Sequence, residues 1–232
     1  MVAITNKVTL VTGASRGIGK EFCRQLKAKN NVVIAGCRNP GDLEDGVADD
    51  VFKLDVSDQA SIAQFAAEVA SKYQHLDLVV NNAGVYGARV GFGEVTAGSM
   101  LDVFNTNAVG PLMLTQALHA KNLLGGKSET TLAHITSKMG AVDDNGSGGS
   151  YAYRASKSAL NIISKSLSVD LEGDNINSTL LHPGWVITEM VDMRGLITTT
   201  QSVSGMIGVL ESKTPAELRG AWHAFDGKVI PW

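Results

Sequence analysis

A phenol and an ammonium group lie four residues apart in the stretch Tyr153-Arg154-Ala155-Ser156-Lys157. In a helix this spacing places the first and last side chains on one face, about one turn apart. A nearby cation stabilises a phenolate, so a lysine here can lower the pKa of a tyrosine from its usual value of about 10. The pattern indicates a tyrosine that exchanges protons with a substrate, although a solvated surface pair has the same spacing.

Two further polar residues favour the catalytic interpretation. Ser137 follows a short apolar run, and its hydroxyl can donate a hydrogen bond to a substrate oxygen. Asn107 lies inside a helical stretch, where asparagine has no propensity advantage. Tyr151 is a rival phenol, but the residue four positions later is Ala155, so we favour Tyr153.

A glycine-rich loop, Thr12-Gly13-Ala14-Ser15-Arg16-Gly17-Ile18-Gly19, follows the first strand-like run. Glycines let the backbone turn tightly and approach a pyrophosphate, and the helix that follows offers unpaired N–H groups and a positive dipole end. A glycine turn without a ligand is the alternative. The residues expected to bind a dinucleotide here are Gly13, Ser15, Arg16, Gly17, Ile18 and Gly19.

The end of the second strand-like run bears on which dinucleotide binds. An acidic residue there would bind the ribose hydroxyls of NAD and repel a 2′-phosphate. This run ends in Gly36-Cys37-Arg38, without an acid. Arg16 and Arg38 can converge on a 2′-phosphate, which predicts NADP(H), whereas two solvated surface arginines are the alternative.

Two more strand ends carry candidate cofactor contacts. Asp55 can accept a hydrogen bond from an adenine amino group, and the small residues of Asn81-Asn82-Ala83-Gly84 leave room for a ribose. The expected contacts in these two places are Asp55, Val56, Asn81, Ala83 and Gly84.

Short β-branched runs that alternate with helical patterns must position these groups. The expected strands cover 8–11, 32–37, 51–54, 76–80, 132–136 and 176–181, with a last strand ending at Phe225. The expected helices run from the glycine loop to Lys29, onward from a cap at Ser57, over 100–124 with a break in character at Gly110-Pro111, over 150–173 and over 203–210. The alternation predicts an α/β fold, a Rossmann-type doubly wound parallel sheet of about seven strands with helices on both faces, whose ligand crevice lies at the carboxyl ends of the strands.

Composition narrows the class of protein. A chain of 232 residues, 44% of them hydrophobic, can bury one core, so we expect a single domain over 1–232. The net charge is −3, and the absence of a basic block argues against nucleic acid as a partner. We expect no signal peptide, no membrane span and no metal site. Two cysteines, Cys23 and Cys37, suit reduced thiols in the cytoplasm.

Together these motifs resemble the short-chain dehydrogenases/reductases of the classical type, from Lys7 to about Thr188. The resemblance rests on T-G-x-x-x-G-x-G, on Asn81 to Gly84, and on Asn107, Ser137, Tyr153 with Lys157, and Pro183-Gly184. The family implies that Tyr153 transfers the proton and that Ser137 orients the substrate oxygen. It also implies that Lys157 binds the nicotinamide ribose and tunes Tyr153, and that Asn107 holds a proton-relay water.

The same resemblance assigns the segment after the sixth strand to the nicotinamide carboxamide. The residues it implies there are Pro183, Gly184, Val186 and Thr188. Ser137 and Tyr153 are farther apart than is usual in the family, and the extra residues lie in the loop from Asp143 to Gly149. With the stretch 182–185 and the end 226–232, this longer loop is similar to the sniffer/C-factor subgroup, which implies a small NADPH-dependent carbonyl reductase.

We therefore expect an enzyme that reduces a small aldehyde or ketone with NADPH. NAD-linked alcohol oxidation is one alternative, and a cofactor-binding regulatory or signalling protein with incidental turnover is another. A short segment, 188–200, is expected to cover an open, apolar substrate pocket, and the family implies a homodimer. Trp185, Met190 and Met193 line that pocket or belong to the core, and His134 and His182 are expected to be hydrogen-bonded core residues.

Overall fold

The computed structural model describes residues 3–232, so residues 1 and 2 of the predicted domain lie outside the described residues. The strands are β1 (Val8–Thr12), β2 (Val32–Cys37), β3 (Asp50–Lys53), β4 (Leu78–Asn81), β5 (Thr130–Ile135), β6 (Ile176–His182) and β7 (Trp222–Ala224). They form one sheet in the order β3-β2-β1-β4-β5-β6-β7, and every neighbouring pair is parallel. The predicted doubly wound parallel sheet is confirmed, and its strand order reverses between β1 and β4.

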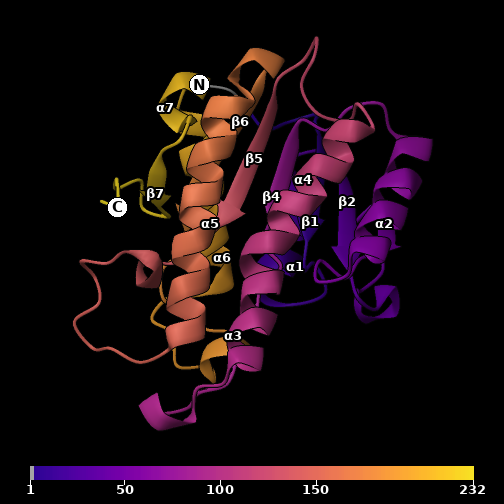
Figure 1. Ribbon diagram of the computed structural model, residues 1–232. Helices are drawn as coiled ribbons and strands as arrows, with labels where there is room; N and C mark the ends of the chain where they lie inside the picture. Colours follow the sequence, from indigo (N-terminus) through magenta and orange to yellow (C-terminus); the bar gives the residue numbers. More distant parts are fainter. Residues whose placement is uncertain (1–2) are drawn as a thin grey trace.

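Helices cover both faces of this sheet. They are α1 (Gly17–Ala28), α2 (Gln59–Lys72), α3 (Ala97–Phe104), α4 (Gly110–Ala120), α5 (Tyr151–Asp170), α6 (Thr199–Ser212) and α7 (Pro215–Leu218). α2, α4 and α5 lie on one face, and α1 and α6 lie on the other (Figure 1). Within residues 3–232 no helix combines the length and the apolar character needed to cross a membrane.

A buried apolar cluster on each face ties the helices to the sheet. On one face Phe22 of α1 packs in a cluster with Met206 of α6, and on the other Phe65 of α2 packs in a cluster with Leu114 of α4. The predicted apolar face of α2 is confirmed, because Ile62, Phe65, Ala66 and Val69 are all buried. These clusters fix the sheet edge on which the functional groups lie.

Strand boundaries differ from the predicted ones by up to two residues. The fourth strand begins at Leu78 rather than at residue 76. The Asp77 carboxylate just before it accepts hydrogen bonds from the Val8 amide and the Lys7 ammonium, both at 2.9 Å. The Leu76 amide donates to the Leu123 carbonyl, outside the sheet. Because residue 76 is also apolar, the predicted fourth strand began before the first residue that the structure assigns to it.

The predicted cap of α2 is wrong by one residue. Asp58, not Ser57, is the N-cap, and its carboxylate accepts hydrogen bonds from the amides of Ala60 and Ser61 at 3.1 and 3.2 Å. Ser57 instead donates its hydroxyl to Asp55 at 2.6 Å. Both residues are good caps by type, and the hydrogen bond to Asp55 decides between them.

The helix predicted over 100–124 is divided differently as well. α3 ends at Phe104, a π-helical turn covers Asn105–Val109, and α4 begins at Gly110. Pro111 does not end the helix, and it directly follows the π-helical turn, whose last hydrogen bond runs from the Gly110 amide to the Asn105 carbonyl. The irregularity comes just before Gly110-Pro111 and includes Asn107.

The corrected cap gives a direct test. We expect Asp58→Ala to lower the free energy of unfolding by about 1 kcal/mol, because two helix amides lose their acceptor. Ser57→Ala, the matched control, removes an exposed hydroxyl and its exposed hydrogen bond to Asp55, and is expected to cost about a few tenths of a kcal/mol. Urea denaturation of both variants measures the difference, and an equal or larger loss in Ser57→Ala would contradict the assignment.

Candidate active site

At the carboxyl edge of the sheet, where the strand order reverses, the Thr12 hydroxyl joins β1 to the residues that follow β4. Its oxygen accepts hydrogen bonds from the amides of Asn82 and Ala83, both at 3.0 Å. The Asn82 side chain in turn donates to the carbonyls of Thr12 and Gly13 at 2.9 and 3.2 Å. Neither Thr12 nor Asn82 was assigned from the sequence, although both belong to its motifs, because their role appears only when β1 and β4 are neighbours.

The glycine loop has the shape that a pyrophosphate requires. Gly13 and Gly17 adopt φ angles of +64° and +55°. A Cβ on Gly13 would lie 2.8 Å from the Ala83 Cα, and one on Gly19 would lie 2.2 Å from the Gly13 carbonyl oxygen. Arg16, the N-cap of α1, makes no side-chain cap hydrogen bond. The N–H groups in the first turn of α1 are therefore available to donate hydrogen bonds to an anion. The residues of this loop fit a dinucleotide.

The two arginines expected to converge on a 2′-phosphate have different neighbours in residues 3–232. Arg16 forms an ion pair with Glu189 across the loop, at 2.7 Å between Nη1 and Oε2. Arg38 is exposed, and its charge helps to lower the pKa of Asp55, after the larger effect of the hydrogen bonds from Ser57. No hydrogen bond or ion pair in residues 3–232 joins Arg16 to a group shared with Arg38. Arg38 thus lies near the expected adenine contact, whereas Arg16 is paired with the segment that follows β6.

Lys157 is buried and carries no carboxylate partner among the described residues. It lies one turn after Tyr153 on α5, and its Nζ donates to the Ile135 carbonyl at 2.8 Å. The ammonium is 5.8 Å from the centroid of the Tyr153 ring. Burial lowers the pKa of Lys157 to about 8. The predicted pairing of phenol and ammonium on one helix face is present.

Tyr153 is partly buried and faces Ser137. Burial raises the pKa of Tyr153 to about 12, the Ser137 hydroxyl opposes that rise, and the charge of an ionised Tyr86 would add to it. The acidic phenol expected from the Lys157 spacing is therefore not produced by the chain alone, because desolvation of the phenol prevails. Ser137 Oγ accepts the Met139 amide at 3.2 Å, which leaves its proton for the phenol or a substrate.

Asn107 is buried and fixed by three hydrogen bonds. Its amide nitrogen donates to the Val85 carbonyl at 2.8 Å and to the Ser156 hydroxyl at 3.0 Å, and its oxygen accepts the Val85 amide at 2.8 Å. A Cβ on Gly84 would lie 3.2 Å from the Asn107 oxygen and 3.7 Å from the Lys157 ammonium. Asn107 and Lys157 therefore meet at Gly84, at the carboxyl end of β4.

The chain turns sharply after β6 in the way that a glycine permits. The Pro183 carbonyl accepts the Ser202 hydroxyl at 2.6 Å. Gly184 has a φ angle of +84°, and a Cβ there would lie 2.8 Å from Ile197 and 2.9 Å from Phe225. Pro183 and Gly184 thus direct the next residues back across the carboxyl edge.

The continuation of this segment lies against the glycine loop. Val186 is buried and pairs with Ile197 in an isolated parallel bridge. The Thr188 methyl group is 3.6 Å from the position of a Cβ on Gly17. Residues predicted to hold the pyrophosphate and the nicotinamide carboxamide of one cofactor are therefore adjacent in space.

The two histidines differ from each other. His134 is fully buried, as expected for a core residue, but its Nε2 has no partner in residues 3–232, and only Nδ1 makes a contact, 3.3 Å from the Asn81 amide nitrogen. Burial, and secondarily the charge of Lys157, lowers the pKa of His134 to about 3. His182 is partly buried and accepts the Lys138 amide at 3.4 Å. Among the described residues no group of three or more His, Cys, Asp or Glu side chains suits a metal.

Apolar side chains near the predicted cover are exposed rather than part of the core. Trp185, Met190 and Met193 keep 52%, 40% and 59% of their surface exposed. They follow β6 in a segment that lies beside the glycine loop.

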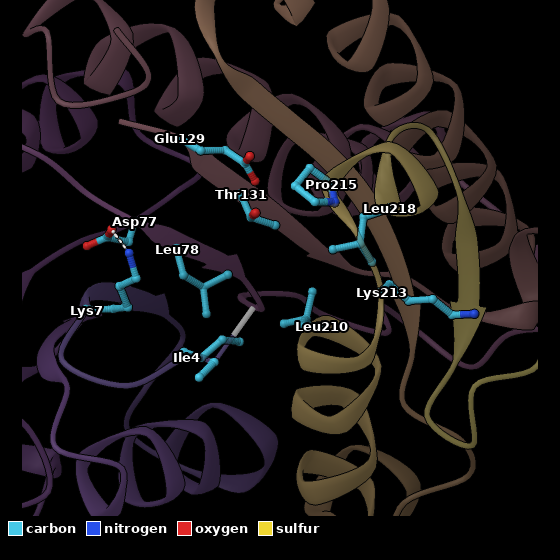
Figure 2. Close-up of a pocket in the computed structure, with 11 residues that line it drawn as sticks. Ile4, Lys7, Asp77, Leu78, Glu129, Thr131, Leu210, Lys213, Pro215 and Leu218 are labelled. Atoms are coloured by element: carbon cyan, nitrogen blue, oxygen red, sulfur yellow. Dashed lines mark hydrogen bonds and ion pairs between the residues drawn. The ribbon is translucent and has the colours of Figure 1, made fainter. Parts of the chain in front are cut away.

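A separate cavity of about 130 Å³ lies at the amino ends of the strands, on the opposite edge of the sheet. Ile4, Leu78, Leu210 and Leu218 supply its apolar walls, and the Lys7–Asp77 ion pair lies beside them (Figure 2). It shares no residue with the site described above.

Comparison with known proteins agrees with this geometry. The family model described as short chain dehydrogenase matches residues 7–200. The C-signal of Myxococcus xanthus is 39% identical over 160 residues, which cover 68% of this chain and 93% of that protein. The 1-hydroxy-2-glutathionyl-2-methyl-3-butene dehydrogenase of a Rhodococcus species is 33% identical over 228 residues, which cover 96% of this chain and 98% of that protein.

Two solved structures have the same fold along nearly the whole chain. An NADPH-bound carbonyl reductase from chicken fatty liver has a TM-score of 0.86 at 32% identity, and the match covers 98% of this chain and 100% of that one. The carbonyl reductase Sniffer of D. melanogaster has a TM-score of 0.85 at 26% identity, with the same coverage. This chain belongs to the short-chain dehydrogenase family. It is an oxidoreductase of the class that transfers a hydride, with sniffer and C-signal among its relatives.

Burial of Lys157 predicts a pH-dependent stability. The folded pKa of about 8 lies below the ordinary 10.5, so the unfolded chain binds more protons between these two pH values. Stability must therefore rise with pH across that window, by about 3 kcal/mol for this one group. We expect the unfolding free energy of the native protein to rise by that amount relative to Lys157→Met between pH 8 and 10.5. Denaturant titrations of both proteins measure the difference, and a difference that stays constant with pH would show that the ammonium is not desolvated.

Proposed function

We propose that this protein reduces a small aldehyde or ketone with NADPH, and that Tyr153 is the general acid. The observation that carries the proposal is the convergence of Tyr153, Ser137 and Lys157 at the carboxyl edge beside the glycine loop. Short-chain dehydrogenase relatives whose names include carbonyl reductase support the direction and the substrate class.

The chain's own groups suit the protonation of an oxygen. NADPH supplies the hydride when it is bound. The Ser137 hydroxyl orients the substrate oxygen, and the Tyr153 phenol donates its proton to that oxygen. A phenol with a pKa of about 12 carries its proton at neutral pH. The protonated phenol is the form that can donate a proton to a carbonyl oxygen during reduction.

Three further residues support this transfer. Lys157, held by the Ile135 carbonyl, places a positive charge below the ring and binds the nicotinamide ribose. Asn107 holds a relay water in our proposal, and its side chain fixes Val85 at the end of β4. The phenol regains its proton through these neighbours after each turnover.

The cofactor choice follows from charge at the end of β2. Arg38 rather than an acidic residue directly follows Cys37, and in our proposal this exposed arginine binds the 2′-phosphate. A related carbonyl reductase was crystallised with NADPH. In our proposal Gly13, Ser15, Gly17, Ile18 and Gly19 bind the pyrophosphate, and Arg16 must exchange Glu189 for phosphate in order to contribute.

Residues 188–200 form the cover of an open, mainly apolar substrate pocket in this proposal. Met190, Met193 and Leu196 are its exposed apolar side chains. We also propose a homodimer built on α4 and α5, because Ile162 and Val169 leave an apolar stripe exposed on α5. A cytoplasmic location suits the two free cysteines.

A signalling protein with incidental turnover is the second candidate. The 39% identity to the C-signal favours it. It requires NADPH to bind and to remain unoxidised by every aldehyde and ketone in a broad panel. Absorbance of NADPH with such a panel separates the two functions.

Removal of the acid tests the proposed role. We expect Tyr153→Phe to lower kcat for carbonyl reduction by at least ~100-fold, with the dissociation constant of NADPH within about twofold of the native value. Tyr151→Phe is the matched control, because Tyr151 contacts Phe92 rather than Lys157, and it is expected to retain activity. Stopped-flow absorbance and NADPH fluorescence give both quantities. Near-native turnover in Tyr153→Phe would refute the assignment.

Replacement of Arg38 tests the cofactor choice. We expect Arg38→Ala to weaken NADPH binding by about 10-fold and to leave NADH binding unchanged, because one charge-assisted contact to the 2′-phosphate is lost. Arg24→Ala, which removes an exposed arginine paired with Glu44, is the control. Fluorescence titration with both cofactors decides the matter, and an equal loss for NADPH and NADH would mean that Arg38 does not recognise the phosphate.

A further inference from the structure

A second tyrosine lies flat against the proposed acid. Tyr86 comes two residues after Gly84, in the loop that follows β4, and its ring is stacked on that of Tyr153 with 4.6 Å between centroids and 24° between planes. Both rings are partly buried. Tyr86 therefore covers one face of the phenol and excludes water from it, while the Lys157 ammonium lies 5.8 Å from the centroid of the same ring.

The hydroxyl of Tyr86 also reaches the start of the helix that carries Tyr153. It shares a hydrogen bond of 2.7 Å with the Ser150 hydroxyl. Ser150 is the N-cap of α5, has a left-handed backbone with φ of 49°, and makes no side-chain cap hydrogen bond to the helix. Tyr86 thus contacts both the Tyr153 ring and the residue from which α5 begins.

Arg89 lies over the ring of Tyr86. Its guanidinium carbon is 5.0 Å from the centroid of the Tyr86 ring. The same guanidinium donates to the Asp192 carboxylate and to the Met190 carbonyl, both at 2.7 Å. Asp192 and Met190 belong to the segment 188–200. Arg89 therefore joins the loop after β4 to the segment that covers the substrate, at one end of the molecule (Figure 1).

These contacts form a layered series from solvent to the reacting proton: Asp192, Arg89, Tyr86, Tyr153. The two outer side chains are exposed, at 60% for Asp192 and 44% for Arg89, and exposed ion pairs are weak. The outer layer can therefore open to admit a substrate and close again. The inner layer, Tyr86 on Tyr153, is partly buried and less exposed than the outer pair.

We propose that Tyr86 is a positioning residue that fixes the Tyr153 phenol, and that Arg89 couples this position to closure of residues 188–200. The proposal rests on the proposed function of Tyr153. A general acid must lie within about 2.6–3.2 Å of the oxygen it protonates. Small displacements are costly, since a shift of about 1 Å can lower a rate by roughly 100-fold. In this arrangement Tyr86 holds one face of the Tyr153 ring, and residues 188–200 close the site from outside. The phenol then reaches the distance required of a general acid only when a substrate is enclosed.

Loss of the stack is expected to lower kcat more than it raises KM. We expect Tyr86→Leu to reduce kcat by at least ~10-fold, with NADPH affinity within about twofold of native, because the phenol loses its fixed position and the cofactor contacts remain. Tyr86→Phe keeps the ring and is expected to restore kcat to within about threefold of native. Equal losses in the two variants would overturn the role of the stack.

A double-mutant cycle tests the coupling. Arg89→Met is expected to lower kcat in the native background and to have little further effect in Tyr86→Leu, because Arg89 acts through Tyr86. Arg194→Met is the matched control, since Arg194 also donates to Asp192, at 2.8 Å, but has no recorded contact with Tyr86. Its effect on kcat is expected to be less than half that of Arg89→Met. Full additivity of Arg89→Met and Tyr86→Leu would refute the coupling.

A measurement that does not depend on catalysis tests the role of Arg89 separately from the proposed function. Hydrogen exchange of the amides in 188–197 is expected to be faster in Arg89→Met than in Arg194→Met. If the native protein reduces no carbonyl, the proposed function fails. The exchange measurement then still supports the Arg89 contact with residues 188–200 if the two variants differ, and overturns it if they exchange equally.

Discussion

The buried ammonium of Lys157 is the charge around which the carboxyl edge of the sheet is organised. Its donor distance of 2.8 Å to the Ile135 carbonyl is the one hydrogen bond recorded for it in residues 3–232, and no carboxylate there compensates it. Removal of a charge from water is costly unless polar groups replace the solvent. The Asn107 oxygen near Gly84 and the absence of a side chain on Gly84 make room for that replacement. Selection for stability alone would not retain a buried, uncompensated lysine. Its presence therefore indicates a functional role.

Desolvation by burial also changes the pKa of the neighbouring Tyr153 phenol. Burial pushes the pKa of Lys157 down to about 8 and that of Tyr153 up to about 12, so both groups are moved toward their neutral forms. The sequence suggested that the cation would dominate and acidify the phenol. In the chain itself desolvation is stronger than the attraction across 5.8 Å. The phenol therefore keeps its proton, and in our proposal Tyr86 and Ser137 determine where that proton points.

Local patterns predicted most of the fold and of the site. The strands were found because each is a compact apolar run between turns, and the glycine loop because Gly13, Gly17 and Gly19 follow such a run. Features that depend on partners distant in sequence were missed. The choice of Asp58 over Ser57 as a cap depends on Asp55, and Thr12 acquires its role only beside Asn82. Tyr86 carries no motif of its own, and only the folding of α5 onto the loop after β4 brings it to Tyr153.

The π-helical turn at Asn105–Val109 constrains how the length of this chain can vary over evolution. Such a turn accommodates one residue more than a regular helix would, and in an α-helix one residue corresponds to a rotation of about 100°. The turn is held on one side by Asn107 bonded to Val85 and on the other by Gly110, where a Cβ would lie 2.5 Å from the Val56 carbonyl. A deletion here would regularise the helix and swing Asn107 away from β4, or else detach α4 from Val56. Insertions and deletions can therefore accumulate in the exposed loop 143–149, whereas this short stretch must keep its residue number as faithfully as a catalytic side chain keeps its type.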